Sequence, residues 1–235
     1  MINRVSALVA LLLISAVSFA QSLNQTDAAG KRHGLWKGTY EKSKRARYEG
    51  TFDHGKETGT FKFFEDNKTS TLAATRVFAA DGSCITTFFD EKGKKVSEGK
   101  EVNKLREGEW KFYDAKTEKL LSTEPYLNGK INGVRKVYFA NGAVAEEAAY
   151  ANGVKQGAYK QYTEKGIVLE ESTYKNDKMD GPATFRNAHG EVVSKGQFAN
   201  NIKTGKWEFF EKGKKAREED MTNKKVQLAR KERKN

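Results

Sequence analysis

The side chains best suited to metal binding or nucleophilic chemistry are scarce in this sequence. Three His and one Cys occur among 235 residues. His33, His54 and His189 lie far apart and lack the short spacings of paired metal ligands, so we expect exposed loop positions and no metal site. Cys84 has no second cysteine with which to form an intramolecular disulfide. We expect it to be a small buried thiol, with a redox or intermolecular role as the alternative.

Signatures of catalytic and phosphate-binding loops are incomplete or missing. Residues 50–56 match the start of a phosphate-binding loop, Gly-x-x-x-x-Gly-Lys, but Glu57 stands where a Ser or Thr would hold magnesium. The sequence contains neither a Gly-x-Ser-x-Gly nucleophile elbow nor a His-Glu-x-x-His zinc motif. It therefore predicts a protein that is not an enzyme, with no catalytic, cofactor-binding or metal-binding residues and no cofactor.

A repeat of 24 or 25 residues accounts for most of the chain. Each unit begins at an anchor residue, which is glycine in every unit except the third. The eight anchors are Gly34, Gly59, Cys84, Gly108, Gly133, Gly157, Gly181 and Gly205. The units occupy residues 34–224, so the sequence predicts a tandem array that buries its apolar groups between neighbouring units.

Aromatic residues keep the same positions in successive units. The slot two residues after the anchor holds Trp36, Phe61, Trp110, Tyr159 and Trp207. Each unit contains two short runs rich in Tyr, Val and Ile, and turn-forming pairs such as Asn128-Gly129 follow the second run. We therefore predict an all-β fold, an elongated antiparallel sheet of tandem β-hairpins with about eight units.

The pattern leaves two arrangements of the aromatic residues open. In residues 108–113, strict alternation places Trp110 and Phe112 on one face of the strand and Lys111 and Tyr113 on the other. Either both faces carry aromatic side chains, or a β-bulge near the anchor glycine changes the phase of the strand.

Charged residues also follow the repeat. The slot fourteen residues after the anchor holds Glu98, Glu147, Glu171 and Glu219, and the slot three residues after it holds Lys62, Lys111, Lys136 and Lys160. A hairpin brings these slots opposite each other, where each pair of opposite charges stabilises the sheet by about 0.2–1 kcal/mol. A carboxylate repeated in successive units is more often structural than catalytic, and no unit stands out as a catalytic site, so we expect a structural ladder. An envelope hydrolase that uses Glu147 and Glu171 is the enzymatic alternative.

The N-terminus has the pattern of a secretory signal peptide. Arg4 precedes the apolar run 5–17, and small residues at Ser18 and Ala20 favour cleavage near Ala20. We therefore predict a signal peptide over residues 1–20 and an exported protein, periplasmic or secreted.

A short lead (residues 21–33) and a basic tail (residues 225–235) are predicted to flank the array. The formal net charge is +12, and residues 224–235 contribute +5 of it through six basic residues and one acidic residue. The tail is expected to be solvated, or to contact an anionic lipid, an envelope polysaccharide or an acidic partner. Export argues against a nucleic-acid partner.

Residues 48–61, with Gly50, Gly55 and Gly59 among aromatic residues, resemble the MORN repeat. Later units, such as the one beginning at Gly133, resemble the MORN variant of the YwqK family of antitoxin-like proteins. The resemblance implies a non-enzymatic scaffold that binds a protein or an envelope component, and the signal peptide adds export to this expectation. An immunity or antitoxin-like protein that neutralises a partner toxin is the alternative.

Overall fold

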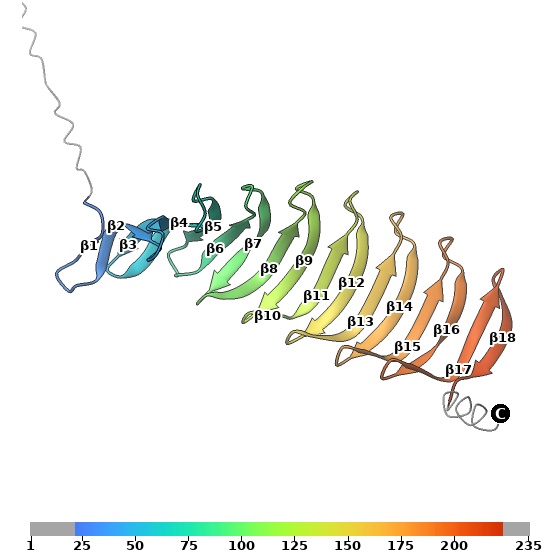
Figure 1. The fold of residues 1–235 in the computed structure, drawn as a ribbon. Helices are drawn as coiled ribbons and strands as arrows, with labels where there is room; N and C mark the ends of the chain where they lie inside the picture. Colours follow the sequence, from blue (N-terminus) through green and yellow to red (C-terminus); the bar gives the residue numbers. More distant parts are fainter. Residues whose placement is uncertain (1–21, 223–235) are drawn as a thin grey trace, which may run out of the picture.

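The computed structural model describes residues 22–222, and this part of the chain forms one open antiparallel sheet of 18 strands without a helix. Successive strands pair with one another along the chain, and β9 pairs with both β10 and β11. Figure 1 shows the hairpins side by side in an elongated array. The predicted all-β fold of tandem hairpins is confirmed.

The strands are β1 Gln25–Thr26, β2 Arg32–Thr39, β3 Ala46–Asp53, β4 Lys56–Phe64, β5 Leu72–Phe78, β6 Cys84–Phe89, β7 Lys95–Val102, β8 Leu105–Tyr113, β9 Leu120–Leu127, β10 Lys130–Ile131, β11 Gly133–Tyr138, β12 Val144–Ala151, β13 Val154–Tyr162, β14 Val168–Lys175, β15 Lys178–Arg186, β16 Val192–Ala199, β17 Ile202–Glu211 and β18 Lys214–Asp220.

The predicted signal peptide (residues 1–20) and the basic tail (residues 225–235) lie outside the described residues. Within the predicted lead, β1 pairs with the start of β2, where Gln25 lies opposite His33. The described part of the chain has no helix long and apolar enough to cross a membrane.

Left-handed residues make the tight turns that join one hairpin to the next. In these turns the residue after the incoming strand has a φ of 44–52°. It is His54, Asn103, Asn128, Asn152, Asn176 or Asn200. Asn adopts this conformation more readily than most residues, which explains its recurrence at the slot. His54 is the exception in the series.

The anchor glycines other than Gly34 lie in β-bulges. All seven anchor glycines have positive φ angles, from 62° to 123°. Beside Gly157, Ala148 lies opposite Tyr159 while Tyr150 lies opposite Lys155, so β13 has two more residues than β12 between the same pairs. Two extra residues leave the phase of the strand unchanged. Arg106 contacts both Trp110 and Phe112, whereas Tyr113 bonds to Glu98, the partner of Lys111. Both faces therefore carry aromatic side chains, which is the first of the two predicted arrangements. Cys84 lies in a segment of β6 that pairs with β5 without such a shift.

One face of the sheet, the aromatic face, holds the core. Phe61, Trp110 and Trp207 are at most 1% exposed. Their rings lie over glycines of the preceding strand, which are Gly50, Gly99 and Gly196 respectively. The absence of a side chain at these glycines makes room for the ring, as close packing requires. Two other units hold different pairs at these positions: Ala148 lies opposite Tyr159, and Ser172 lies opposite Ala183.

Candidate functional site: a charged row and a histidine cluster

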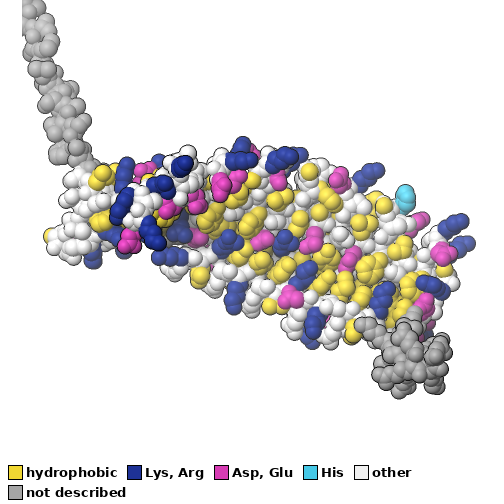
Figure 2. Space-filling model, in the orientation of Figure 1, with side chains coloured by type: hydrophobic (Ala, Val, Ile, Leu, Met, Phe, Trp, Pro, Cys, Tyr) yellow, Lys and Arg dark blue, Asp and Glu magenta, His cyan; other side chains and the backbone are white. Residues whose placement is uncertain are grey.

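A single row of charged and hydroxyl side chains crosses the sheet from β2 to β18. We call it the charged row. Each member is the direct partner of the next: Lys37, Glu49, Lys62, Thr75, Thr87, Glu98, Lys111, Thr123, Lys136, Glu147, Lys160, Glu171, Thr184, Lys195, Glu208 and Glu218. Figure 2 shows basic and acidic side chains beside one another, among hydrophobic ones, along the array.

Ion pairs connect neighbouring members of the charged row. Lys136 Nζ lies 3.2 Å from Glu147, and Lys160 Nζ lies 3.2 Å from Glu171. Lys111 lies opposite Glu98. These contacts confirm the predicted ladder for Glu98, Glu147 and Glu171.

The prediction for Glu219 is wrong. Glu219 lies opposite Trp207, and Glu218 takes the place in the charged row. The cause is the last turn, in which only residues 212 and 213 separate β17 from β18. The corresponding turn of the preceding hairpin, between β15 and β16, spans residues 187–191. The shorter turn moves the register of β18.

Tyrosines cover the carboxylates of the charged row. Tyr162 donates a hydrogen bond to Glu147 at 2.8 Å, and Tyr113 donates one to Glu98 at 2.5 Å. The Tyr162 bond, followed by the bond from Lys136, lowers the pKa of Glu147, and burial raises the pKa of Tyr162 to about 12. Glu147 is therefore ionised at neutral pH, which suits an ion pair and not proton donation.

The aromatic face contains one buried polar cluster, beside the degenerate third anchor. Glu101 is 7% exposed, accepts a hydrogen bond from Thr86 at 2.8 Å and forms an ion pair with Arg76 at 3.1 Å. Cys84 lies next to this group and is buried, as predicted. Burial raises the pKa of its thiol, which lowers the fraction present as the reactive thiolate.

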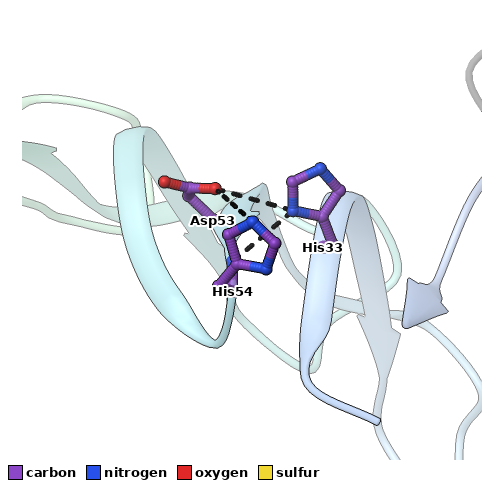
Figure 3. A group of neighbouring side chains, drawn as sticks. All are labelled: His33, Asp53 and His54. Atoms are coloured by element: carbon purple, nitrogen blue, oxygen red, sulfur yellow. Dashed lines mark hydrogen bonds and ion pairs between the residues drawn. The ribbon is translucent and has the colours of Figure 1, made fainter. Parts of the chain in front are cut away.

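His33 and His54 meet at the N-terminal end of the sheet, although 21 residues separate them in sequence (Figure 3). Their ring centroids lie 4.8 Å apart. Asp53 Oδ1 lies 3.6 Å from His33 Nδ1 and 3.8 Å from His54 Nε2. All three side chains are about half exposed or more, at 49% for His33, 63% for Asp53 and 65% for His54.

Asp27 lies behind this cluster and holds one of its rings. One carboxylate oxygen of Asp27 lies 2.6 Å from His54 Nδ1. The other accepts hydrogen bonds from the backbone N–H groups of Ala29 and Lys31, both at 2.9 Å. The pKa of Asp27 is lowered, chiefly by the bond from His54. Its side chain is 10% exposed, so the carboxylate is fixed in place.

The expectation that the histidines are exposed is confirmed, but His33 belongs to β2 and not to a loop. The reasoning from local spacing missed the proximity of His33 and His54. The repeat register could have predicted this contact. The residue before an anchor lies beside the next tight turn, and in the first unit these positions are His33 and His54. His189 lies in a separate turn, and its backbone N–H bonds to Asn187.

The tandem hairpins define an all-β protein built from a linear array of repeats. Residues 131–152 and 155–176 match the family described as MORN repeat variant. The chain therefore contains MORN repeat variants, and its other units follow the same period and register.

Comparison with curated proteins finds no match. Among solved structures, an S. aureus TarM mutant in complex with fondaparinux, α-GlcNAc-glycerol and UDP is 13% identical, with a TM-score of 0.26. The match covers 52% of this chain and 19% of that one. A Bacteroides fragilis protein of unknown function is 7% identical with a TM-score of 0.14, over 72% of this chain and 95% of that one.

Proposed function

We propose that this protein is an exported, non-enzymatic scaffold whose sheet binds another protein or a component of the cell envelope. MORN repeats are commonly binding or scaffold modules, and this chain contains them. The observation that carries the proposal is the charged row, which crosses the described hairpins as an unbroken series of Lys, Glu and Thr.

The charged row presents its charges in a regular series to solvent. The side chains of Lys136 and Lys160 are each 42% exposed, so each can bind a partner while it holds its own glutamate. Lys136 and Lys160 lie two strands apart, which places them about 10 Å apart along the sheet. A long partner with spaced acidic or hydroxyl groups is the kind of surface that this row complements.

The partner can be tested by capture from the native envelope at low and at moderate salt. The wild-type chain is compared with a charge-swapped variant that combines Lys136→Glu with Glu147→Lys. The swap keeps an ion pair between positions 136 and 147 but sets a lysine opposite Lys160 and removes the bond from Tyr162. Capture is therefore compared at a temperature at which circular dichroism shows both chains folded, and we expect it to fall. A variant without residues 225–235 separates adsorption through the basic tail from binding by the sheet.

Two results would count against a scaffold. One is a wild-type chain that stays monomeric, captures no partner and does not associate with the envelope. The other is capture by the charge-swapped variant that equals wild type at both salt concentrations, because the charged row would then play no part in recognition.

Export has a test of its own. Fractionation of the native cell should place the protein outside the cytoplasm, and sequencing of the mature N-terminus should begin near Gln21. A cytoplasmic protein that retains residues 1–20 would contradict export and leave the scaffold proposal to be judged on capture alone.

A further inference from the structure

The first hairpin differs from the others at two slots that touch each other. In four later units the side chain before an anchor accepts a hydrogen bond from the backbone N–H of the next turn's asparagine, at 3.0–3.2 Å. The donor and acceptor pairs are Asn128 and Glu107, Asn152 and Asn132, Asn176 and Gln156, and Asn200 and Asp180. In the first hairpin both slots hold histidine, and the N–H of His54 lies 3.5 Å from His33 Nδ1.

We propose that His33, Asp53 and His54 bind a divalent transition-metal ion of the Zn²⁺ type. Imidazole nitrogen and carboxylate oxygen are ligands that zinc accepts, and three protein ligands with an open position are a recurrent zinc arrangement. Within residues 22–222, these three side chains form the group whose ligand atoms lie close enough together, within 4.8 Å of one another.

The distances suit a tetrahedral ion after small side-chain rotations. Zinc–nitrogen and zinc–oxygen bonds of about 2.0–2.2 Å place two tetrahedral ligands about 3.3–3.5 Å apart. Asp53 Oδ1 lies 3.6 Å from His33 Nδ1 and 3.8 Å from His54 Nε2. Both histidine rings are exposed enough to rotate, so these gaps can close without movement of the sheet.

The two imidazoles present lone pairs toward this point. Asp27 accepts from Nδ1–H of His54, which leaves the lone pair of that ring on Nε2, the atom that faces Asp53. A carboxylate behind a ligating histidine orients the ring and strengthens it as a ligand. His33 Nδ1 carries its lone pair toward the backbone N–H of His54, 3.5 Å away, and a bound ion would replace that N–H as the partner of this nitrogen.

A metal at this point would join three segments of the N-terminal end. His33 belongs to β2, Asp53 ends β3 and His54 begins the turn into β4. Asp27 adds the loop that follows β1. The remaining coordination positions face solvent, because all three side chains are about half exposed or more.

Titration of the full chain, without a histidine tag, with ZnCl₂ in a calorimeter tests the site. We expect one ion per chain in the wild type. His54→Asn places at the turn the residue that five other turns already use, and His33→Gln copies the Gln156 slot, so both variants should fold. Each should weaken zinc binding by at least about tenfold, as loss of a ligand must exceed the roughly 10–100-fold effect of an outer-shell partner.

His189→Asn is the matched control, because it removes the remaining histidine of the chain from a distant turn. It should bind zinc as the wild type does. Asp27→Asn keeps an oxygen for the backbone bonds but loses the carboxylate, and should weaken binding by about 10–100-fold. In NMR spectra of the imidazole groups, zinc should shift the signals of two of the three histidines.

Either of two results would overturn the proposal. One is no heat of binding and no imidazole shift in the wild type at zinc concentrations up to the millimolar range. The other is unchanged affinity in both His33→Gln and His54→Asn, with circular dichroism spectra in EDTA equal to that of the wild type.

Discussion

The glycine beneath Trp207 offers a direct test of packing on the aromatic face. A Cβ atom at Gly196 would lie 2.4 Å from Cδ2 of Trp207 and 2.5 Å from Cε2, far inside van der Waals contact. The indole cannot move away freely. Its Nε1–H donates to the carbonyl of Gln197 at 3.1 Å, and the ring of Phe198 packs edge-on against it with 5.2 Å between ring centroids. Gly196→Ala should therefore strain the pairing of β16 with β17.

The expected magnitude is a difference between two opposing effects. Alanine in a strand interior is favoured over glycine by about 0.5–1 kcal/mol, because it loses less backbone entropy on folding. Overpacking of a well-filled core costs about 1–3 kcal/mol. The steric effect is the larger, so Gly196→Ala should reduce the free energy of unfolding by about 0.5–2 kcal/mol.

The sign should reverse when the ring is absent. Trp207→Ala alone should cost about 3–5 kcal/mol as a large-to-small core change. In that background Gly196→Ala should stabilise the sheet by about 0.5–1 kcal/mol, since the added methyl meets no ring. The Ser172 and Ala183 pair is the natural example of this combination.

Thermal unfolding followed by circular dichroism measures the global effect, at roughly 2–4 °C per kcal/mol for a chain of this size. Hydrogen exchange over β16 and β17 measures the local effect, which matters because repeat arrays open unit by unit. A higher melting temperature for Gly196→Ala in the wild-type background would refute the reasoning. An equal loss of stability in both backgrounds would refute it as well.

Three further predictions follow from the anchors and the charged row. Gly133→Val should cost more than about 1 kcal/mol, because φ is 123° and the new Cβ would lie 2.9 Å from Pro125 Cγ; an unchanged thermal midpoint would contradict this. Glu147→Gln should lower stability at pH 7 and flatten the loss on acidification. Folding lowers the pKa of Glu147, so the ionised carboxylate contributes its full stabilisation above the ordinary pKa of 4.5 and loses it as the pH falls through the lowered pKa. Curves of stability against pH that run parallel for the variant and the wild type would contradict this prediction. Tyr162→Phe should remove one phenol that titrates near pH 12 in an ultraviolet absorbance titration, and loss of an early-titrating phenol instead would show that Tyr162 is not buried against Glu147.

The architecture of this protein could be predicted from its sequence because its determinants are local. The anchor period, the turn asparagines and the aromatic slots each act within one unit or between adjacent units. The pairing of Glu147 with Lys136 can also be predicted from the repeat period, because the hairpin turn sets which positions lie opposite each other. The hairpin array and most of the charged row therefore needed no tertiary information.

The tertiary structure decided where the strand register departs from the regular period of the repeat. The bulges at the anchor glycines keep the phase of each strand, so aromatic side chains lie on both faces of the sheet. The short last turn places Glu218 where the period predicts Glu219. The histidine cluster depends on the same physics. His33 and His54 belong to different hairpin segments, and only the lateral pairing of β2 with β3 brings the residue before an anchor against the next turn. Sequence periodicity determined the slots, and strand pairing decided which slots touch.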